Sequence, residues 1–169
     1  YETRVAEGAT VAGKAMFVCS NRTIAYDFYK IVKELRPEWT KKKICDDGVL
    51  LSEKDKKELK PMEKIKLVMT RNKDDEKDLF DMLGTKEDRK EFDRQFKNPK
   101  SNFKIAIVVD MWLTGFDVPE LDTIYIDKPI QQHTLIQTIS RANRVCEGKD
   151  KGLIVDYIGI KKNMNTALK

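Results

Sequence analysis

The stretch KIAIVVDMWLTGFDVPELDTIYID, residues 104–127, decides the fold class of this chain. Two short apolar runs, 105–109 and 123–126, flank a loop that contains Gly115 and a proline. Continuous apolar runs of this length are typical of strands that are buried on both faces. The run that follows, QTISRANR at 137–144, has apolar residues at helical spacing. The predicted order is therefore strand, loop, strand, helix.

The same patterns predict further strands and helices along the chain. Short apolar runs predict strands at 14–20, 64–70 and 152–157. A helix is predicted from Thr23 to the residue before Pro37, and another over 86–98. The first is defined by the apolar residues Ile24, Phe28, Ile31 and Leu35. Strands that alternate with helices favour right-handed crossovers, so the expected fold class is α/β with a mainly parallel central sheet flanked by helices.

Three segments lie outside this alternation. Residues 1–13 have no sustained period and are interpreted as a connector. Residues 40–60 are dominated by Lys, Asp and Glu, which predicts a charged surface insertion with a short helix capped by Ser52. Residues 161–169 are expected to start a segment that leads to the next domain. The predicted domain therefore covers residues 14–160.

Composition restricts the class of protein. With 169 residues, 40% of them hydrophobic, the chain is long enough for one domain with a core. Its 33 Lys and Arg against 28 Asp and Glu give a formal charge of +5, which permits a polyanionic partner without requiring one. No apolar run approaches bilayer length, and three scattered cysteines favour a reducing, cytoplasmic location. The start at Tyr1, without Met, suggests a piece of a longer protein.

Gln137, Arg141 and Arg144 share one face of the helix predicted at 137–144, at about 100° per residue. Apolar residues occupy the opposite face. Guanidinium groups suit phosphate because their planar fork binds two oxygens and stays charged. The run therefore indicates an anion-binding face, and a solvated amphipathic helix is the alternative that the run alone leaves open.

Polar clusters follow the predicted strands, at the edge where parallel sheets bind ligands. They lie at 20–22, 70–71 and 110–117. In the last cluster, Gly115 lets the backbone approach a ligand, and Asp117 is placed to accept hydrogen bonds from ribose hydroxyls. An ordinary turn has the same pattern. No Gly-x-x-x-x-Gly-Lys-Ser/Thr phosphate loop occurs, so a triphosphate cradle must lie elsewhere.

Other site chemistry is disfavoured. The single histidine, His133, and the scattered cysteines argue against a Ser-His-Asp or Cys-His apparatus. Asp110 and Asp127 have no paired carboxylate neighbour, so no metal site is predicted.

The chain resembles superfamily 2 helicases and translocases at their motifs IV, V and VI, in the stretches 14–22, 104–119 and 137–144. The resemblance is strongest to the motor (R) subunit of type I restriction enzymes. It rests on VDMWLTGFDVP at 109–119, TIYIDKP at 123–129 and GLIVDYIG at 152–159. Ser140 stands where many relatives have glycine, which argues against the DEAD-type RNA helicases.

The resemblance implies a second RecA-like motor domain and assigns roles to its residues. ATP with Mg²⁺ is then bound mainly by a first RecA-like domain that is absent here. Arg141 and Arg144 are the motif VI arginines, with Arg144 as the finger, and Gln137 couples nucleotide contacts to closure. Gly115 and Asp117 contact ribose and phosphate. The implied contacts to a DNA backbone are Ser20, Asn21, Arg22, Thr70, Arg71 and Thr114.

The implied function is the C-terminal RecA-like half of an ATP-dependent double-stranded DNA translocase in a type I restriction-modification enzyme. This piece alone is expected to be inactive, because it lacks the phosphate loop and the nuclease site. Implied partners are double-stranded DNA, the first RecA-like and nuclease domains of the same polypeptide, and the methyltransferase and specificity subunits; no membrane partner is expected. The alternatives are another superfamily 2 repair or remodelling translocase, and a non-catalytic nucleic-acid-binding module.

Overall fold

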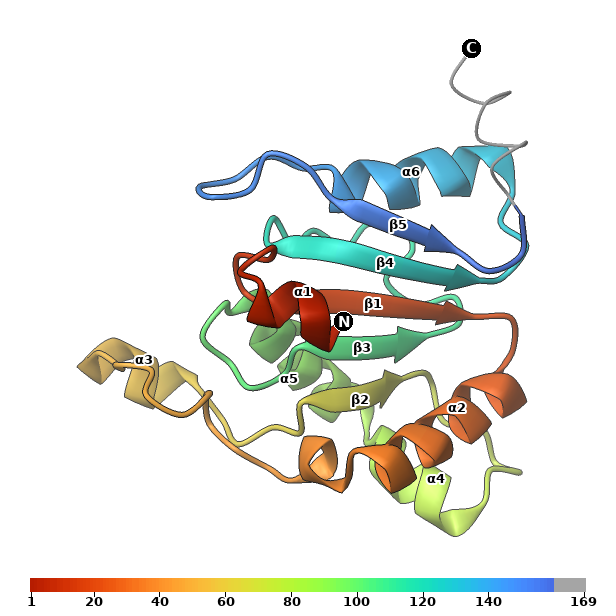
Figure 1. Ribbon diagram of the computed structural model, residues 1–169. Helices are drawn as coiled ribbons and strands as arrows, with labels where there is room; N and C mark the ends of the chain where they lie inside the picture. Colours follow the sequence, from red (N-terminus) through yellow and green to blue (C-terminus); the bar gives the residue numbers. More distant parts are fainter. Residues whose placement is uncertain (160–169) are drawn as a thin grey trace.

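Five parallel strands form the centre of the domain in the computed structural model, which describes residues 1–159 (Figure 1). Their order across the sheet is β2-β3-β1-β4-β5, and each neighbouring pair is parallel. The strands are β1 (Lys14–Cys19), β2 (Ile65–Val68), β3 (Ile105–Val108), β4 (Leu121–Asp127) and β5 (Leu153–Asp156). All of them lie where apolar runs predicted strands, so the parallel sheet is confirmed.

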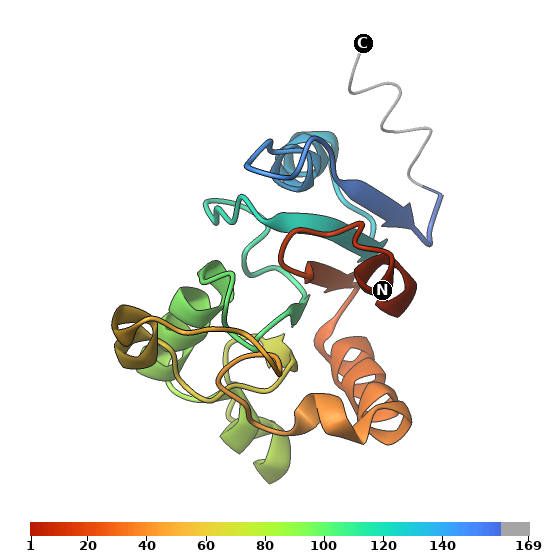
Figure 2. The ribbon, with the colours of Figure 1, turned by 60° about the vertical axis from the view of Figure 1, so that its left-hand side comes forward.

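Helices cover both faces of the sheet (Figures 1 and 2). One face carries α2 (Arg22–Leu35) and α4 (Lys77–Leu83), and the other carries α5 (Lys86–Lys97) and α6 (Gln132–Ala142). Because successive strand residues point to opposite faces, Met16 of β1 joins the α5 and α6 core while Ala15 joins the α2 and α4 core. The predicted α/β class with flanking helices is therefore confirmed. None of the helices described has the length and apolar character needed to cross a membrane.

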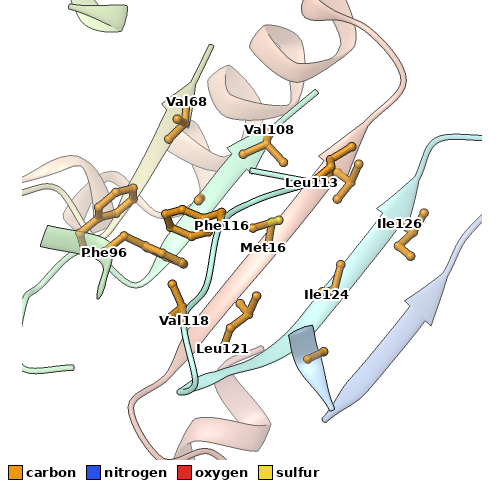
Figure 3. Packing of buried hydrophobic residues seen from close by; sticks show 14 of the residues in the cluster. Met16, Val68, Phe96, Val108, Leu113, Phe116, Val118, Leu121, Ile124 and Ile126 are labelled. Carbon is orange, nitrogen blue, oxygen red and sulfur yellow. The ribbon is translucent and has the colours of Figure 1, made fainter. Parts of the chain in front are cut away.

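The connection from β3 to β4, residues 109–120, contains no helix. Since both strands run parallel to β1, the chain must return from the carboxyl edge of the sheet to the amino edge. It returns along the α5 and α6 face as a loop that buries Leu113, Phe116 and Val118 in the same core as Phe96 of α5 (Figure 3). The loop thus takes the place of a crossover helix.

Helix α2 is confirmed, but only part of the apolar stripe that predicted it faces the core, where Phe28 stacks on Phe17 of β1. Ala25 and Tyr29 are buried against the sheet. Ile31 and Leu35 remain exposed within the part of the chain that the structure describes. The helix is thus rotated so that Ala25, Tyr29 and Phe28 face the sheet.

The flanking segments contain short helices. In the segment interpreted as a connector, α1 (Glu2–Ala6) was not predicted, and Arg4 pairs with Asp122 of β4 at 2.8 Å. A 3₁₀ turn, η1 (Pro37–Thr40), follows α2. The expected start of a segment at 161–169 lies outside the described residues.

The charged insertion contains the short helix that its sequence predicted. This helix, α3 (Glu53–Glu58), begins at Ser52, whose hydroxyl accepts a hydrogen bond from the N–H of Asp55 at 3.1 Å. The Asp55 carboxylate accepts in return from the Ser52 N–H at 2.8 Å, which completes a capping box.

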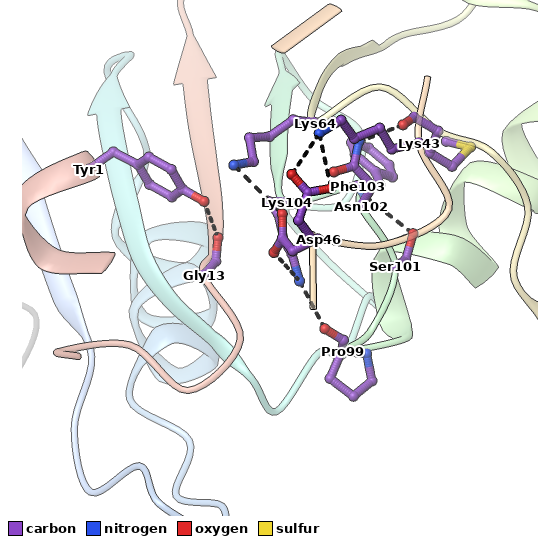
Figure 4. Close-up of polar contacts among 12 residues, drawn as sticks. Tyr1, Gly13, Lys43, Asp46, Lys64, Pro99, Ser101, Asn102, Phe103 and Lys104 are labelled. Carbon is purple, nitrogen blue, oxygen red and sulfur yellow. Dashed lines mark hydrogen bonds and ion pairs between the residues drawn. The ribbon is translucent and has the colours of Figure 1, made fainter. Parts of the chain in front are cut away.

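Lysine amines that bind backbone carbonyls close the amino edge of the sheet. Lys104 Nζ donates to the carbonyl of Pro99 at 2.9 Å (Figure 4), and Lys14 Nζ donates to that of Phe103 at 2.5 Å. Burial lowers the pKa of both amines. Both amines are therefore hydrogen-bonded inside the fold, and these two lysines have a structural role.

Candidate functional site

The predicted site residues fall into two regions. The first, the carboxyl-edge cluster, lies at the ends of β1, β2 and β3 and comprises Ser20, Asn21, Arg22, Thr70, Arg71 and Asp110. The second, the loop–helix site, belongs to the crossing loop, α6 and the residues just after α6. It comprises Thr114, Gly115, Asp117, Gln137, Arg141 and Arg144.

The expectation that Asp117 lies at the carboxyl edge of the sheet does not hold. Asp110 lies there, but the loop has crossed the sheet by Asp117, four residues before β4 begins at Leu121. Helix α6 also runs from the carboxyl edge toward the amino edge (Figure 1). Arg144 lies near the start of β4, because Lys149 Nζ donates to the carbonyls of both Arg144 and Leu121. A parallel sheet imposes this geometry, because each connection must return to the amino edge.

Arg22 of the carboxyl-edge cluster is held by partners inside the domain. Its Nη2 contacts both carboxylate oxygens of Asp75 at 2.6 Å, and its Nη1 donates to the carbonyl of Thr70 at 2.5 Å. Burial raises the pKa of Asp75, but the hydrogen bonds from Arg22 and from the N–H of Asn72 outweigh it and hold that pKa below its ordinary value. Arg22 therefore joins the ends of β1 and β2.

Other members of the cluster also have structural partners. Arg71 Nε donates to the carbonyl of Phe80 at 2.8 Å, and its guanidinium lies 4.2 Å from the centre of the Phe80 ring. The Ser20 hydroxyl donates to the carbonyl of Asp127. Asn21 caps α2 by accepting from the N–H of Ile24 at 2.9 Å. Thr70 and Thr114, which were also expected to contact DNA, are both exposed.

A small cavity of about 110 Å³ lies within the carboxyl-edge cluster. Arg22 and Thr70 line one side, and Asp110 and Met111 line the other. Lys128, which sequence reasoning missed, pairs with Asp110 and donates to the carbonyl of Val109 at 2.9 Å. The cavity thus touches the first residues of the crossing loop.

The crossing loop has an unusual backbone. Trp112 has φ of +67°, which is rare outside glycine, and its ring stacks on Phe116 with 4.2 Å between centroids. Gly115 also has a positive φ, of +71°, and a Cβ there would meet no atom within 4 Å. Strained backbone persists where the surrounding structure holds it, and it gathers at functional sites. Gly115 leaves the loop surface open to a ligand.

Arg141 is one of the groups that hold the loop. Its Nη1 donates to the carbonyls of Trp112 at 2.7 Å and Phe116 at 2.5 Å, the two residues that flank the bend. Burial lowers its pKa, yet a guanidinium titrates so high that it stays charged near neutral pH. The expected outward position toward an anion is therefore only partly met, because the half-buried guanidinium already binds two carbonyls.

Arg144 lies beyond α6, which ends at Ala142, so the prediction of one continuous helical face through Arg144 is wrong. Gly152, just before β5, packs so closely against this end of the helix that a Cβ there would overlap the Ala142 carbonyl oxygen. The Arg144 guanidinium pairs with the Asp117 carboxylate, and the two side chains are 50% and 57% exposed. This is an accessible ion pair on the rim of the loop.

Gln137 lies on α6 one turn before Arg141 and is partly exposed. Its Nε2 is 3.0 Å from Nε2 of His133. No hydrogen bond joins it to either arginine among the described contacts. The three predicted residues therefore have three different environments.

Lys149 also belongs to this region, and sequence reasoning missed it. It is only 4% exposed, and its Nζ donates to the carbonyls of Pro119 at 2.9 Å, Leu121 at 2.7 Å and Arg144 at 2.8 Å. A lysine in the run EGKDKG has the pattern of a solvated turn, so no local signal marks it.

Within residues 1–159 no three His, Cys, Asp or Glu side chains gather as metal ligands would. Fold and site together define a three-layer α/β domain in which a strained loop meets Arg141 of α6 and Arg144 just beyond it, near the amino edge of a parallel sheet.

The chain belongs to the family of type I restriction enzyme subunit R, domain 3, whose sequence model matches residues 12–159. It is 39% identical over 160 residues to the type I restriction enzyme HindI endonuclease subunit of Haemophilus influenzae, which covers 93% of this chain and 14% of that protein. It is 40% identical over 157 residues to the putative type I restriction enzyme MjaIXP endonuclease subunit of Methanocaldococcus jannaschii. This match covers 92% of this chain and 13% of that protein. The chain thus spans about a seventh of the length of these relatives.

Among solved structures, the C-terminal domain of S. cerevisiae Dbp5 is distantly similar. The match has 15% identity and a TM-score of 0.48, and it covers 97% of this chain and 70% of that one.

Proposed function

We propose that this domain is the second RecA-like half of an ATP-dependent double-stranded DNA translocase in a type I restriction-modification enzyme. Family membership supports the enzyme system, and the relatives' names supply its endonuclease context. The chain corresponds to about a seventh of the length of these relatives. The proposed activity therefore belongs to the whole subunit, of which this domain is one part.

The observation that carries the proposal is the difference between Arg141 and Arg144. Arg141 is half-buried and bound to two loop carbonyls, whereas Arg144 is exposed and bound to an exposed carboxylate. An exposed ion pair contributes only about 0–1 kcal/mol, so Arg144 can exchange Asp117 for a more highly charged triphosphate at small cost. An arginine finger of this kind contributes roughly 10³–10⁵ in phosphoryl transfer.

Each residue of the loop–helix site then has a separate task. Arg144 is the finger that stabilises charge on the triphosphate, and Arg141 holds the loop. Release from Arg144 frees Asp117 to accept hydrogen bonds from ribose hydroxyls, beside the open backbone at Gly115. Gln137, one turn from Arg141, couples nucleotide contacts to the closure of the two RecA-like domains. Closure of a second domain gates hydrolysis because the finger acts only when it is docked.

The carboxyl-edge cluster supplies the DNA-binding surface in this proposal. Arg71 has no carboxylate partner among the described residues and contributes positive potential, while Arg22, paired with Asp75, shapes the surface. The exposed Thr70 hydroxyl and nearby backbone N–H groups donate to phosphates, and Thr114 of the loop–helix site adds a second exposed hydroxyl. Ser20 and Asn21 set the loop and helix start that form this edge. Phosphate contacts without base contacts suit movement along any sequence and make binding fall steeply with salt.

ATP with Mg²⁺ is proposed to be held mainly by a first RecA-like domain of the same polypeptide. The residues of this chain fit the other side of such a site: an exposed guanidinium, a free backbone at Gly115 and a carboxylate at Asp117. Alone, this domain is proposed to hydrolyse no ATP. Its proposed partners are double-stranded DNA, the nuclease domain, and the methyltransferase and specificity subunits, in the cytoplasm.

The test is the double-stranded-DNA-stimulated ATPase of the full-length R subunit with Arg144→Ala. The expected loss of kcat is at least about 10³-fold, with DNA binding retained. Arg94→Ala is the matched control, because Arg94 is an exposed arginine on α5 that pairs with Glu91 away from this site. Unchanged turnover together with weakened DNA binding would instead support a non-catalytic binding module and overturn the motor assignment.

A further inference from the structure

Lys149 is a buried cation whose hydrogen bonds all go to backbone carbonyls. Its three N–H groups match three carbonyl oxygens, those of Pro119, Leu121 and Arg144, at 2.7–2.9 Å. No ion pair to a carboxylate involves Lys149 among the described residues, and burial lowers the pKa of its amine. A buried ammonium is costly unless it is fully hydrogen-bonded, so this arrangement needs all three carbonyls in place.

The three carbonyls belong to two segments that are far apart in sequence. Pro119 comes two residues after Asp117 in the crossing loop, and Leu121 begins β4. Arg144 follows the end of α6. One amine therefore ties the loop, the first residue of a central strand and the arginine together.

Arg144 needs such an anchor because the helix does not hold it. Its N–H makes only a long bond of 3.4 Å to the Arg141 carbonyl, and its side chain is bound only to exposed Asp117. The turn that carries Lys149 is itself fixed by paired backbone hydrogen bonds between Cys146 and Lys149, at 3.1 and 2.9 Å. Lys149 is thus held on a rigid turn and aimed at the backbone of Arg144.

We propose that Lys149 is the positioning residue of the Arg144 finger. It sets the backbone on both sides of the Arg144–Asp117 pair, so that the guanidinium moves between Asp117 and a triphosphate from a fixed base. This inference rests on the proposed function of Arg144. Lys149 touches neither nucleotide nor DNA in this account and acts only through Arg144.

The test uses Lys149→Met in the full-length subunit, a change that keeps an unbranched apolar stem and removes the amine with its donors. We expect kcat of the DNA-stimulated ATPase to fall about 10–100-fold, as for a misplaced catalytic group, with KM for ATP and DNA affinity within twofold of wild type. Lys151→Met is the matched control, because Lys151 is exposed two residues away, and it should change nothing. Lys149→Gln, which keeps two N–H donors, replaces the Met variant if that variant unfolds, and an intermediate loss of kcat is expected.

A double variant separates positioning from general structural damage. If Lys149 acts through Arg144, then adding Lys149→Met to Arg144→Ala lowers kcat no further. A kcat within twofold of wild type for the Lys149 single variants, or an equal further loss in the Arg144→Ala background, overturns the inference while the motor assignment stands. If Arg144→Ala itself keeps full turnover, the proposed function fails, and this inference fails with it.

Discussion

Arg22 in the carboxyl-edge cluster and Arg144 in the loop–helix site pair with carboxylates of opposite exposure. Arg22 pairs with Asp75, whose side chain is 8% exposed, while Arg144 pairs with Asp117, whose side chain is 57% exposed. The first pair joins two strand ends, and the second joins a loop to the residue after a helix. The burial of the carboxylate therefore decides whether an arginine is a structural tie or an exchangeable group.

The largest expected effect tests the close packing of Gly152 against the end of α6, just before Arg144. Gly152→Ala places a methyl group on the Ala142 carbonyl, which is backbone and cannot swing away. We expect a loss of about 3 kcal/mol or more in the free energy of unfolding, measured by urea denaturation. Gly48→Ala is the control, because its φ is +82° in open space and it should cost only about 1 kcal/mol. Equal losses in the two variants would remove the packing argument.

The next effect compares the two arginines directly. Arg22→Met leaves Asp75 buried without its partner, so we expect a loss of about 2 kcal/mol in the free energy of unfolding. Arg144→Met breaks an exposed pair and should cost no more than about 0.5 kcal/mol. Urea denaturation of both variants beside wild type measures this difference. If Arg144→Met is as damaging as Arg22→Met, the idea of an exchangeable guanidinium is wrong.

The smallest effect concerns pH. The folded-state pKa of Asp75 lies below that of the unfolded chain, about 3.9 for an aspartate, so its stabilisation is fully present above that value and is lost as the pH falls through the folded pKa. Wild type should therefore exceed Asp75→Asn in unfolding free energy by a constant margin above about pH 5. Below about pH 4 the margin should shrink. Denaturation at several pH values measures the margin, and one that grows on acidification contradicts the assigned direction.

Local sequence patterns were sufficient to predict the strands and helices that form the layers of this fold. The runs 105–109 and 123–126 are continuous and apolar because both of their faces are buried, and that requirement is visible in the residues themselves. Capping and helical spacing likewise predicted α3 and α5. The rotation of α2 was not predictable, because either of its faces is apolar enough to pack.

The candidate site was predicted in composition but not in arrangement. Arg144 meets Asp117, and Arg141 binds the loop next to Gly115 at Phe116. These contacts lie away from the carboxyl edge, where the strand ends had suggested a single site. Nothing local distinguishes a loop that stays at one edge from one that crosses a sheet and becomes part of its core.

The amino-acid sequence alone determined the parallel α/β sheet, the family and the chemical types of the site residues, since these depend on short-range pattern and residue identity. Tertiary structure decided which arginine pairs with a buried carboxylate and which pairs with an exposed one, because the burial of these partners depends on residues far away in the chain. The same holds for Lys149, which resembles a solvated turn residue until folding brings the carbonyls of Pro119, Leu121 and Arg144 around its amine. Hydrogen-bond partners separated by 28 and 30 residues leave no mark in a local pattern.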